Sequence, residues 1–570
     1  MLDRDEKPKE KKMNKPKDVE WMAMIYLSGD NNLSQAMAGT FREFGKAFFP
    51  YPKNPEKVAV LVYYDGGGIG VPTFYCDFTD PDHSSVESID ETDSAHSASI
   101  TKFLSWCNDR YKARRHILFL SGHSDGFQGI SLMKDDTSKK AMSLHWLHDS
   151  LKRRAVDEFF NKKLDILCFD SCVMALAEVA YEFEDCSKFL ISSQGLIPQE
   201  GLNYRRALMG ILEKPETETE NIARNIVRTY LEYQRVFAAG GRSVTLSACR
   251  LDRLEDSMIP PIKMLADKIN DLGKTLVGRF DHYLRLKEEY ERLWHASQSG
   301  TFDEGKAAEL LSMMRPIEFL KRALINSQWN AQSFLFDQAI DIVDFCEWMI
   351  GETAFFGEYM GDIGKLCREI RDICRDKVVI STFTETEPFL VGSEYQNANG
   401  LSLFFPWTEL SLAISDGEYK KLKIFEQPVG EHKYHNWNCF LQTYLNSITL
   451  IKEPFSNDFT ELNSGLVNKY DLEARERLER NVAIESGTIS TDRHVDPGKH
   501  VDPGKHVDPG KHVDPGKHVD PGRHVDPGKG LDMNIYLKYL NTYKNYPSDC
   551  VDPLEIANSL LGAGGVLGNM

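Results

Sequence analysis

Short apolar runs alternate with amphipathic segments along the first half of the chain. Five such runs begin at Trp21, Val58, His116, Leu164 and Lys188, and none shows the strict alternation of a half-exposed strand. Helical spacing of apolar residues follows in residues 33–49, 93–110 and 173–186. The pattern therefore predicts an α/β fold, in which buried parallel strands alternate with helices that cover both faces of the sheet.

The second half of the chain continues this pattern less regularly. A strand and a helix are predicted near residue 245, and residues 255–380 are mostly helical and strongly charged. Residues 400–407, "GLSLFFPW", predict a last buried strand that ends at a proline, and residues 435–446 predict a closing helix. We expect one domain over residues 19–452, with a helical insertion at about 275–335.

Both ends of the chain are too polar to form a core. Residues 1–18 predict a charged, disordered tail, and residues 453–493 predict a linker. The hexamer HVDPG(K/R) then occurs six times over residues 494–529, with valine as the single large apolar residue of each unit. A β-solenoid needs more apolar residues than this, so we interpret the repeat as a spacer. Residues 530–570 complete a largely disordered C-terminal tail.

Composition narrows the classes of function. The formal net charge of -18 disfavours binding to nucleic acid and to anionic membranes, and no run approaches 18 apolar residues. The 11 cysteines include no C-x-x-C pair, which argues against a disulfide framework or a zinc ribbon and favours a reducing compartment. The N-terminus has no apolar signal segment. We predict a cytoplasmic protein, and secretion by another route stays open.

The chemistry of an open α/β sheet lies beyond the carboxyl ends of its strands. His123 follows the third predicted strand, Asp170 and Cys172 follow the fourth, and Glu200 follows the fifth. Cys168 lies inside the fourth strand and is predicted to be buried. Cys172 lies at the start of the predicted helix 173–186, where a helix N-terminus favours a thiolate and His123 can take its proton. Spacing alone leaves open whether Cys172 is a nucleophile or a small buried residue.

Five segments together resemble the clostripain family of cysteine peptidases: "WMAMIYLSGDNNL", "HILFLSGHSDGF", "LDILCFDSCVMALAEVAYEF", "SSQGLIPQEGLNY" and "GLSLFFPW". The most specific element is a strand followed by D-x-C-x-M and E-V-A-Y-E, here Asp170, Cys172, Met174 and Glu178–Glu182. The resemblance covers residues 20 to 450. It implies a caspase-like α/β/α sandwich with a mostly parallel sheet.

The resemblance also implies the roles of individual residues. Cys172 would be the nucleophile and His123 the general base, and backbone N–H groups of Ser124 and Cys172 would hold the oxyanion. The family usually has glycine after this histidine and a tryptophan in the loop after strand five. This chain has Ser124 and Leu202 at these positions, which puts the conformation after His123 and the detailed substrate preference in doubt.

The family cleaves after arginine or lysine, and the resemblance assigns two acidic residues to the pocket for that side chain. They match Asp170 and Glu200, and two carboxylates in one recess would stabilise a guanidinium or an ammonium group. Asp170 has a second interpretation as a cap of the helix before Cys172. The expected partners are therefore peptide or protein substrates with Arg or Lys before the scissile bond.

Family members often cut their own chain between the histidine and cysteine strands. Lys139 and Lys140 lie there in a polar loop, so self-cleavage after one of them is expected, although an ordinary solvated loop is an equal alternative. No cofactor is required, and a dependence on calcium is left open. His145 and His148 are predicted to be surface histidines. A different class of function also remains, an inactive binding or scaffold protein that uses the acidic cleft and the repeat tail.

Overall fold

The structure is a computed structural model that describes most of the first 450 residues. The described ranges are 15–44, 55–68, 71–79, 85–128, 131–238, 244–277, 322–334, 338–355, 357–382, 395–406, 417–425 and 437–449, with a few isolated positions between them. The chain divides into two units, Met1–Asp492 and Arg493–Met570, and every element below belongs to the first. Most of the predicted insertion 275–335, the linker 453–493, the repeats 494–529 and residues 530–570 lie outside the described residues.

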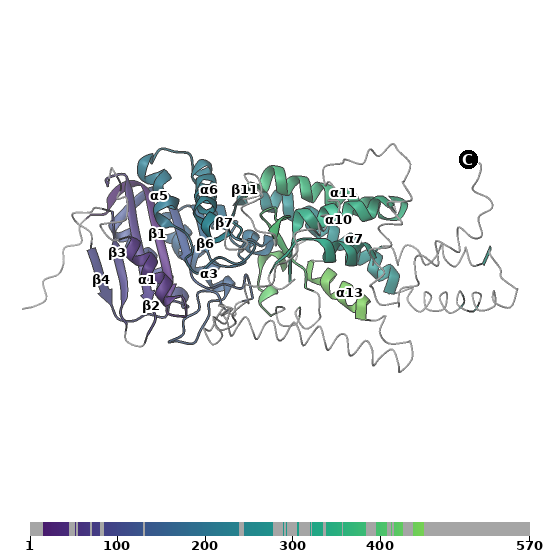
Figure 1. Ribbon diagram of the computed structural model, residues 1–570, viewed down its shortest axis with the longest axis horizontal. Helices are drawn as coiled ribbons and strands as arrows, with labels where there is room; N and C mark the ends of the chain where they lie inside the picture. Colours follow the sequence, from purple (N-terminus) through teal and green to yellow (C-terminus); the bar gives the residue numbers. More distant parts are fainter. Residues whose placement is uncertain are drawn as a thin grey trace, which may run out of the picture. The chain divides into compact units, whose positions relative to one another are not determined.

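A nine-stranded sheet forms the centre of the first unit, in the order β11-β8-β7-β6-β5-β1-β2-β3-β4 (Figure 1). Its strands are β1 (Lys17–Gly29), β2 (Val58–Gly66), β3 (Thr73–Asp77), β4 (Ser85–Ile89), β5 (Tyr111–Ser121), β6 (Leu164–Asp170), β7 (Ser187–Ser192), β8 (Ser247–Arg250) and β11 (Val379–Thr382). The five neighbouring strands β7, β6, β5, β1 and β2 are parallel. On one side β8 pairs antiparallel with β7 and β11 with β8, and on the other β3 pairs antiparallel with β2 and β4 with β3. The prediction of a mostly parallel sheet is confirmed, and its parallel centre consists of the five predicted strands.

The helices over residues 15–277 are α1 (Ser34–Glu43), α2 (Ser97–Arg110), α3 (Leu144–Ser150), η1 (Leu151–Phe160), α4 (Ala177–Glu182), α5 (Tyr204–Glu213), α6 (Thr219–Ala238), η2 (Leu251–Arg253), η3 (Leu254–Met258) and α7 (Ile259–Val277). Those further along are α10 (Ile342–Phe355), α11 (Gly357–Ile373), η4 (Cys374–Val378), η8 (Lys423–Phe425) and α13 (Trp437–Thr449). The predicted closing helix at 435–446 is confirmed by α13.

Helices cover both faces of the sheet. Tyr26 of β1 packs against Phe103 of α2, with 6.2 Å between ring centroids, and it pairs in register with Leu120 of β5. Phe119 precedes Leu120 and therefore points to the other face, where its ring lies 5.4 Å from that of Tyr204 in α5. Because both faces are covered, the central strands carry continuous apolar runs. This arrangement confirms the predicted α/β/α sandwich.

The predicted strand at 400–407 does not join the main sheet. It forms β12 (Ser402–Phe404) of a three-stranded antiparallel sheet with β10 (Ala339–Asp341) and β9 (Ser333–Phe334). The Ser402 N–H donates to the Ala175 carbonyl, 2.8 Å away, and the Phe404 N–H donates to Glu178 Oε1 at 3.0 Å. Glu178 of the E-V-A-Y-E motif therefore holds β12 of the small sheet next to the segment that follows Cys172, through its hydrogen bond from Phe404.

Among the helices that the structure describes, we find none with the length and apolar character that crossing a membrane requires.

Candidate active site

Strand register brings the predicted histidine and cysteine to the same edge of the sheet. Strands β5 and β6 are parallel neighbours, and Ser121 of β5 pairs with Asp170 of β6. His123 and Cys172 each follow that pair by two residues. Because neighbouring strands run about 4.8 Å apart, both side chains begin from matching positions at the carboxyl edge.

The two cysteines of this segment have different surroundings. Cys168 is fully buried in β6, and burial raises the pKa of its thiol well above the ordinary value, so the prediction that it packs in the core is confirmed. Cys172 is only half-buried. The Ile197 N–H donates a hydrogen bond to Cys172 Sγ, with the nitrogen 3.3 Å from the sulfur. The thiol can in turn donate to the Ile197 carbonyl oxygen, 3.8 Å from the sulfur, so the backbone of Ile197 offers the sulfur both a donor and an acceptor.

The predicted helix 173–186 begins later than expected. Its helical part, α4, starts only at Ala177, so Cys172 does not lie at a helix N-terminus and that argument for a thiolate is wrong. The residues between Cys172 and α4 instead lie beside the segment that comes after β7. The N–H groups of Val173 and Ala175 donate to the carbonyls of Gly195 and Ser193 in that segment, at 3.0 and 2.9 Å. These long-range bonds replace the first helical turn.

A strained residue directly follows the candidate nucleophile. Val173 has a φ of +58°, in the left-handed region that a β-branched side chain rarely occupies. The hydrogen bond from its N–H to Gly195 holds it there. Strain of this kind persists where the surrounding structure enforces it and is frequent at functional sites.

His123 is held by a residue that the sequence analysis missed. Its Nε2 lies 2.5 Å from Oδ1 of Asn32, in the loop between β1 and α1. The carboxamide oxygen can only accept, so Nε2 carries the proton and Nδ1 keeps a lone pair. Burial, followed by the charge of Lys134, lowers the pKa of His123 to about 4. The imidazole is therefore neutral at pH 7.

Asp170 uses its carboxylate within the protein. Oδ2 accepts from Ser121 Oγ and from the Tyr204 hydroxyl, each at 2.9 Å, and Oδ1 accepts from the Leu202 N–H at 3.0 Å. It therefore fastens the loop after β7 and does not cap a helix, so that interpretation is wrong. Burial raises the pKa of Asp170 despite these three donors.

The loop after β7 turns tightly over Asp170. Gly201 has a φ of +59°, and a Cβ at this position would lie 2.6 Å from Asp170 Oδ2, so only glycine fits. Leu202, which stands where the family has tryptophan, is buried. Glu200 Oε2 is also buried, and it has no hydrogen-bond partner among the residues that the structure describes.

Tyr230 of α6 is a second residue that the sequence analysis missed. Its side chain is buried, and its hydroxyl finds no hydrogen-bond partner in the described part of the chain. Burial raises the pKa of this phenol well above its ordinary value, and the nearby charges of Asp170, Cys172 and Glu200 add to the rise. Helix α6 packs against β6 and β7, the strands that lead into Cys172 and into the loop of Glu200. No local signal marks Tyr230, because in sequence it is one more inward residue of an amphipathic helix.

Ser124 does not need the freedom of the glycine that the family usually has. Outside glycine, positive φ values in the described ranges fall at Met133, Lys139, Asn161 and Val173, so Ser124 has an ordinary backbone conformation. Its hydroxyl accepts from the Gly126 N–H at 3.1 Å and lies 2.7 Å from Met174 Sδ. The substitution thus adds contacts inside the loop after His123.

Lys139 and Lys140 lie in an exposed tight hairpin. Asp135 and Lys140 exchange two backbone hydrogen bonds of 3.0 and 3.2 Å, and Lys139 has a φ of +57°. Lys140 Nζ forms an ion pair with Asp93 at 2.9 Å. The Asp136 N–H donates to the Asp30 carbonyl at 2.7 Å, which ties the hairpin to the loop that carries Asn32.

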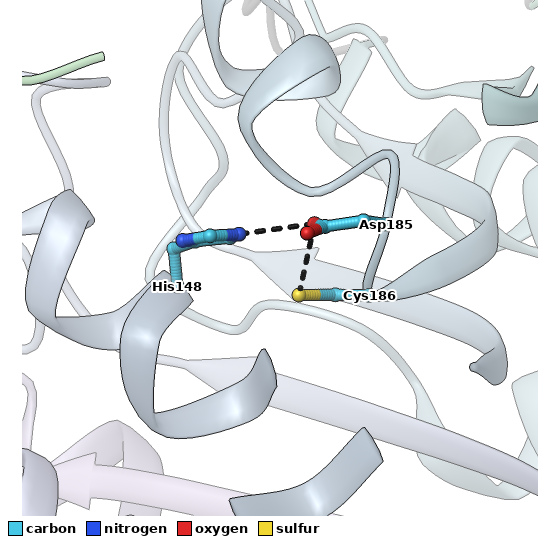
Figure 2. Close-up of side chains that lie close together, drawn as sticks. All are labelled: His148, Asp185 and Cys186. Atoms are coloured by element: carbon cyan, nitrogen blue, oxygen red, sulfur yellow. Dashed lines mark hydrogen bonds and ion pairs between the residues drawn. The ribbon is translucent and has the colours of Figure 1, made fainter. Parts of the chain in front are cut away.

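A second group of histidine, cysteine and carboxylate lies at the amino end of β7. His148, Asp185 and Cys186 form this amino-edge cluster, and their ligand atoms lie within 4.8 Å of one another (Figure 2). His148 Nε2 lies 3.0 Å from Asp185 Oδ1. His148 is therefore not the surface histidine that we predicted, because its partners are distant in sequence.

The amino-edge cluster is compensated by neighbouring charges. Lys423 Nζ lies 3.9 Å from Asp185 Oδ1, and His148 Nδ1 lies 3.8 Å from the buried Glu182. Burial, followed by the charge of Asp185, raises the pKa of Cys186 well above its ordinary value, so its sulfur is a protonated thiol. A protonated thiol and an adjacent ammonium group fit an ion-pair network better than a cation site.

Comparison with known proteins places these features in one family. The model of the clostripain family matches residues 25–427. The clostripain of Hathewaya histolytica is 24% identical over 226 residues, which cover 34% of this chain and 42% of that protein. The match therefore spans less than half the length of that relative.

Two solved structures are similar over most of their own length. A secreted C11 cysteine protease from Bacteroides thetaiotaomicron, in complex with an irreversible peptide inhibitor, has a TM-score of 0.45 and 14% identity, covering 70% of this chain and 96% of that one. An inactive zymogen C11 protease from Parabacteroides distasonis has a TM-score of 0.46 and 17% identity, covering 72% and 97%.

Proposed function

This chain belongs to the clostripain family of cysteine peptidases, and from this premise we propose that it is an endopeptidase with Cys172 as nucleophile and His123 as general base. The observation that carries the proposal is the register of β5 and β6, because the pair Ser121 and Asp170 puts both residues at equivalent positions past the strand ends. Asn32 is proposed as the residue that orients His123.

The proposed reaction is acyl transfer through a thioester. Nδ1 of the neutral His123 takes the proton from Cys172 as its sulfur attacks the peptide carbonyl carbon, and the oxygen of the tetrahedral intermediate accepts from the Ser124 and Cys172 N–H groups. The imidazolium then gives its proton to the leaving amine. Water attacks the thioester, again with His123 as base, and releases the acid and the thiol.

We propose arginine or lysine as the residue before the scissile bond. Glu200 supplies a carboxylate oxygen that has no hydrogen-bond partner among the described residues, and it directly precedes the turn at Gly201 over the buried Asp170. Since three internal donors occupy Asp170, Glu200 makes the direct contact with the cation, and Asp170 contributes charge from beneath and holds the loop. Peptides and proteins with an accessible basic residue are the proposed substrates.

Self-cleavage after Lys139 or Lys140 is part of the proposal. Both residues are exposed, but peptidases bind extended segments, and the paired hairpin has to open before either bond can enter a cleft. We therefore expect slow processing that mild heating accelerates. An intact single band from active protein, indistinguishable from the Cys172→Ala protein, would refute it.

The proposed chemistry requires no cofactor, because the thiol and the imidazole supply the nucleophile and the proton transfer. A dependence on calcium is left open, and activity measured with and without a calcium chelator decides it. The cytoplasmic location remains a prediction, and the similar protein from Bacteroides thetaiotaomicron is described as secreted. Fractionation of cells that express the chain distinguishes the two locations.

The test of the proposed function is hydrolysis of fluorogenic peptides that end in Arg, Lys, Asp or Leu before the reporter. Turnover confined to Arg and Lys, and lost in Cys172→Ala, is the expected result. Turnover directed at Asp or Leu would keep the nucleophile and refute the basic specificity. No turnover, before and after a trial cut near Lys140, would favour the inactive scaffold.

Alkylation separates the enzyme from the scaffold without a substrate. The main argument for an inactive scaffold was that Ser124 stands where the family usually has glycine. Ser124 has an ordinary φ, so the missing glycine is no obstacle to the conformation after His123 and the argument is weakened. An activated Cys172 should react with iodoacetamide at least about 10³-fold faster than the buried Cys186, whose pKa is raised well above its ordinary value. Equal rates for these two thiols in the folded protein would contradict the enzyme.

A further inference from the structure

We infer that the Tyr230 hydroxyl is a specificity-determining group that hydrogen-bonds the positive side chain before the scissile bond. The inference rests on the proposed function and deepens it, because it names a protein group beyond Asp170 and Glu200 that recognises the substrate. It assigns to α6 one wall of the substrate pocket.

A buried hydroxyl without a partner needs an explanation. Buried polar atoms in proteins are nearly always hydrogen-bonded, and leaving one unpaired destabilises the fold. The Tyr230 hydroxyl is buried with no partner in the described chain, although the other buried residues of this stretch, Ile222, Ala223, Ile226 and Val227, are apolar. Phenylalanine would fill the same space without that cost, so the hydroxyl has a use outside the free protein.

The surroundings of Tyr230 indicate that use. The charges that act on its phenol come from Asp170, Cys172 and Glu200, which are the two pocket carboxylates and the nucleophile. Helix α6, which carries Tyr230, packs against β6 and β7, and Glu200 lies in the loop that follows β7. Glu200 Oε2 is likewise buried and without a hydrogen-bond partner among the described residues. Two such oxygens are complementary to a ligand that brings several N–H donors and a positive charge.

Asp170 does not complete this site by itself. Its two oxygens already accept from Ser121, Tyr204 and Leu202. A guanidinium or ammonium group in the pocket therefore finds free acceptors at Glu200 Oε2 and at the Tyr230 oxygen. The Tyr230 hydroxyl keeps its own proton for a second contact, so it can accept from the cation without any change of charge.

Two buried tyrosines provide a matched pair for the experiment. The Tyr204 hydroxyl donates to Asp170 Oδ2 at 2.9 Å, whereas the Tyr230 hydroxyl has no partner in the part of the chain that the structure describes. Tyr230→Phe should keep the melting temperature of the wild type or raise it, because no internal hydrogen bond is lost. Tyr204→Phe should lower it.

The experiment measures kcat/KM on peptides that differ only before the scissile bond, carrying Arg, Lys, citrulline or norleucine. For Tyr230→Phe we expect a loss of about tenfold with Arg and Lys and less than twofold with norleucine. Inhibition by agmatine, which copies the arginine side chain, should weaken by a similar factor. In the double variant with Glu200→Gln the losses should not add, because both groups bind one cation.

Three results would overturn the inference. If Tyr230→Phe cleaves Arg and Lys peptides within twofold of the wild type, Tyr230 has no part in recognising the substrate, and the proposed basic specificity is unaffected. An equal loss on all four peptides would assign Tyr230 a structural role. Wild-type turnover restricted to norleucine would refute both the basic specificity and the role of Tyr230.

Discussion

Two groups with the same chemical components lie at opposite ends of one parallel sheet. The amino-edge cluster combines His148 and Cys186 with Asp185, before β7. The carboxyl-edge site combines His123 and Cys172 with carboxylates, beyond β5 and β6. Residue types alone would assign metal binding or nucleophilic catalysis to either of them.

The two groups differ in how far their polar atoms are paired. In the amino-edge cluster the imidazole bonds to Asp185, and Lys423 lies beside the same carboxylate. At the carboxyl edge, Glu200 Oε2 and the Tyr230 hydroxyl are buried with no hydrogen-bond partner among the described residues, and Val173 is strained. Compensated groups stabilise the fold, whereas unpaired groups lower stability and are explained by a ligand.

Removing the two thiols gives the largest contrast. Cys172→Ala should lower kcat by about 10⁴-fold or more, because no other group forms the thioester. Cys186→Ala should leave kcat within about twofold, since burial raises the pKa of this thiol and keeps it protonated. Steady-state hydrolysis of an Arg peptide measures both. Activity retained by Cys172→Ala would contradict the assignment.

Neutralising one carboxylate in each group gives the next contrast. Glu200→Gln should lower kcat/KM for Arg and Lys peptides by about 10- to 100-fold, because a charge-assisted hydrogen bond to the substrate is lost. Asp185→Asn should leave the preference among peptides unchanged. A shift of preference in Asp185→Asn at unaltered stability would show that the amino-edge cluster contributes to the active site.

The pH dependence of kcat/KM tests the proposed role of His123 and its contact with Asn32. Because burial and Lys134 lower the pKa of His123 to about 4, the free enzyme keeps a neutral imidazole above that pH, and the acid limb of kcat/KM should lie near 4. Asn32→Asp adds a negative charge that favours the imidazolium, so the limb should move to higher pH. Asn32→Ala should lower kcat about tenfold. Asp185→Asn is the control whose limb should not move.

The smallest expected effect concerns the stability of the amino-edge cluster. Burial raises the pKa of Asp185, but the His148 hydrogen bond and Lys423 outweigh it and lower the value to about 2. The resulting stabilisation is present above the unfolded pKa near 4 and is lost as pH falls through 2. Asp185→Asn should therefore unfold about 1 kcal/mol more easily at pH 7, and the difference should shrink at pH 2 and vanish below it, measured by urea titration. A constant difference across this range would contradict it.

Local patterns determined the parallel centre of the sheet and the edge that carries the chemistry. Apolar runs without alternation predicted β1, β2, β5, β6 and β7, because strands covered on both faces exclude polar residues. The same reasoning separated Cys168 inside a strand from Cys172 beyond it. Asn32 also lies beyond the carboxyl end of a strand, since it follows β1. Inspection of every strand end would therefore have identified it.

Only the tertiary structure decided which of these residues meet and which are paired. The segment Val173–Leu176 has a helical pattern, but it bonds to the chain after β7 and to β12, more than 220 residues away in sequence, and α4 starts later. His148 meets Asp185 because helix α3 lies against the start of β7, and the proposed pocket draws Tyr230 from a helix and Glu200 from a loop. A periodicity records which face of an element is buried, and it does not record what lies against that face.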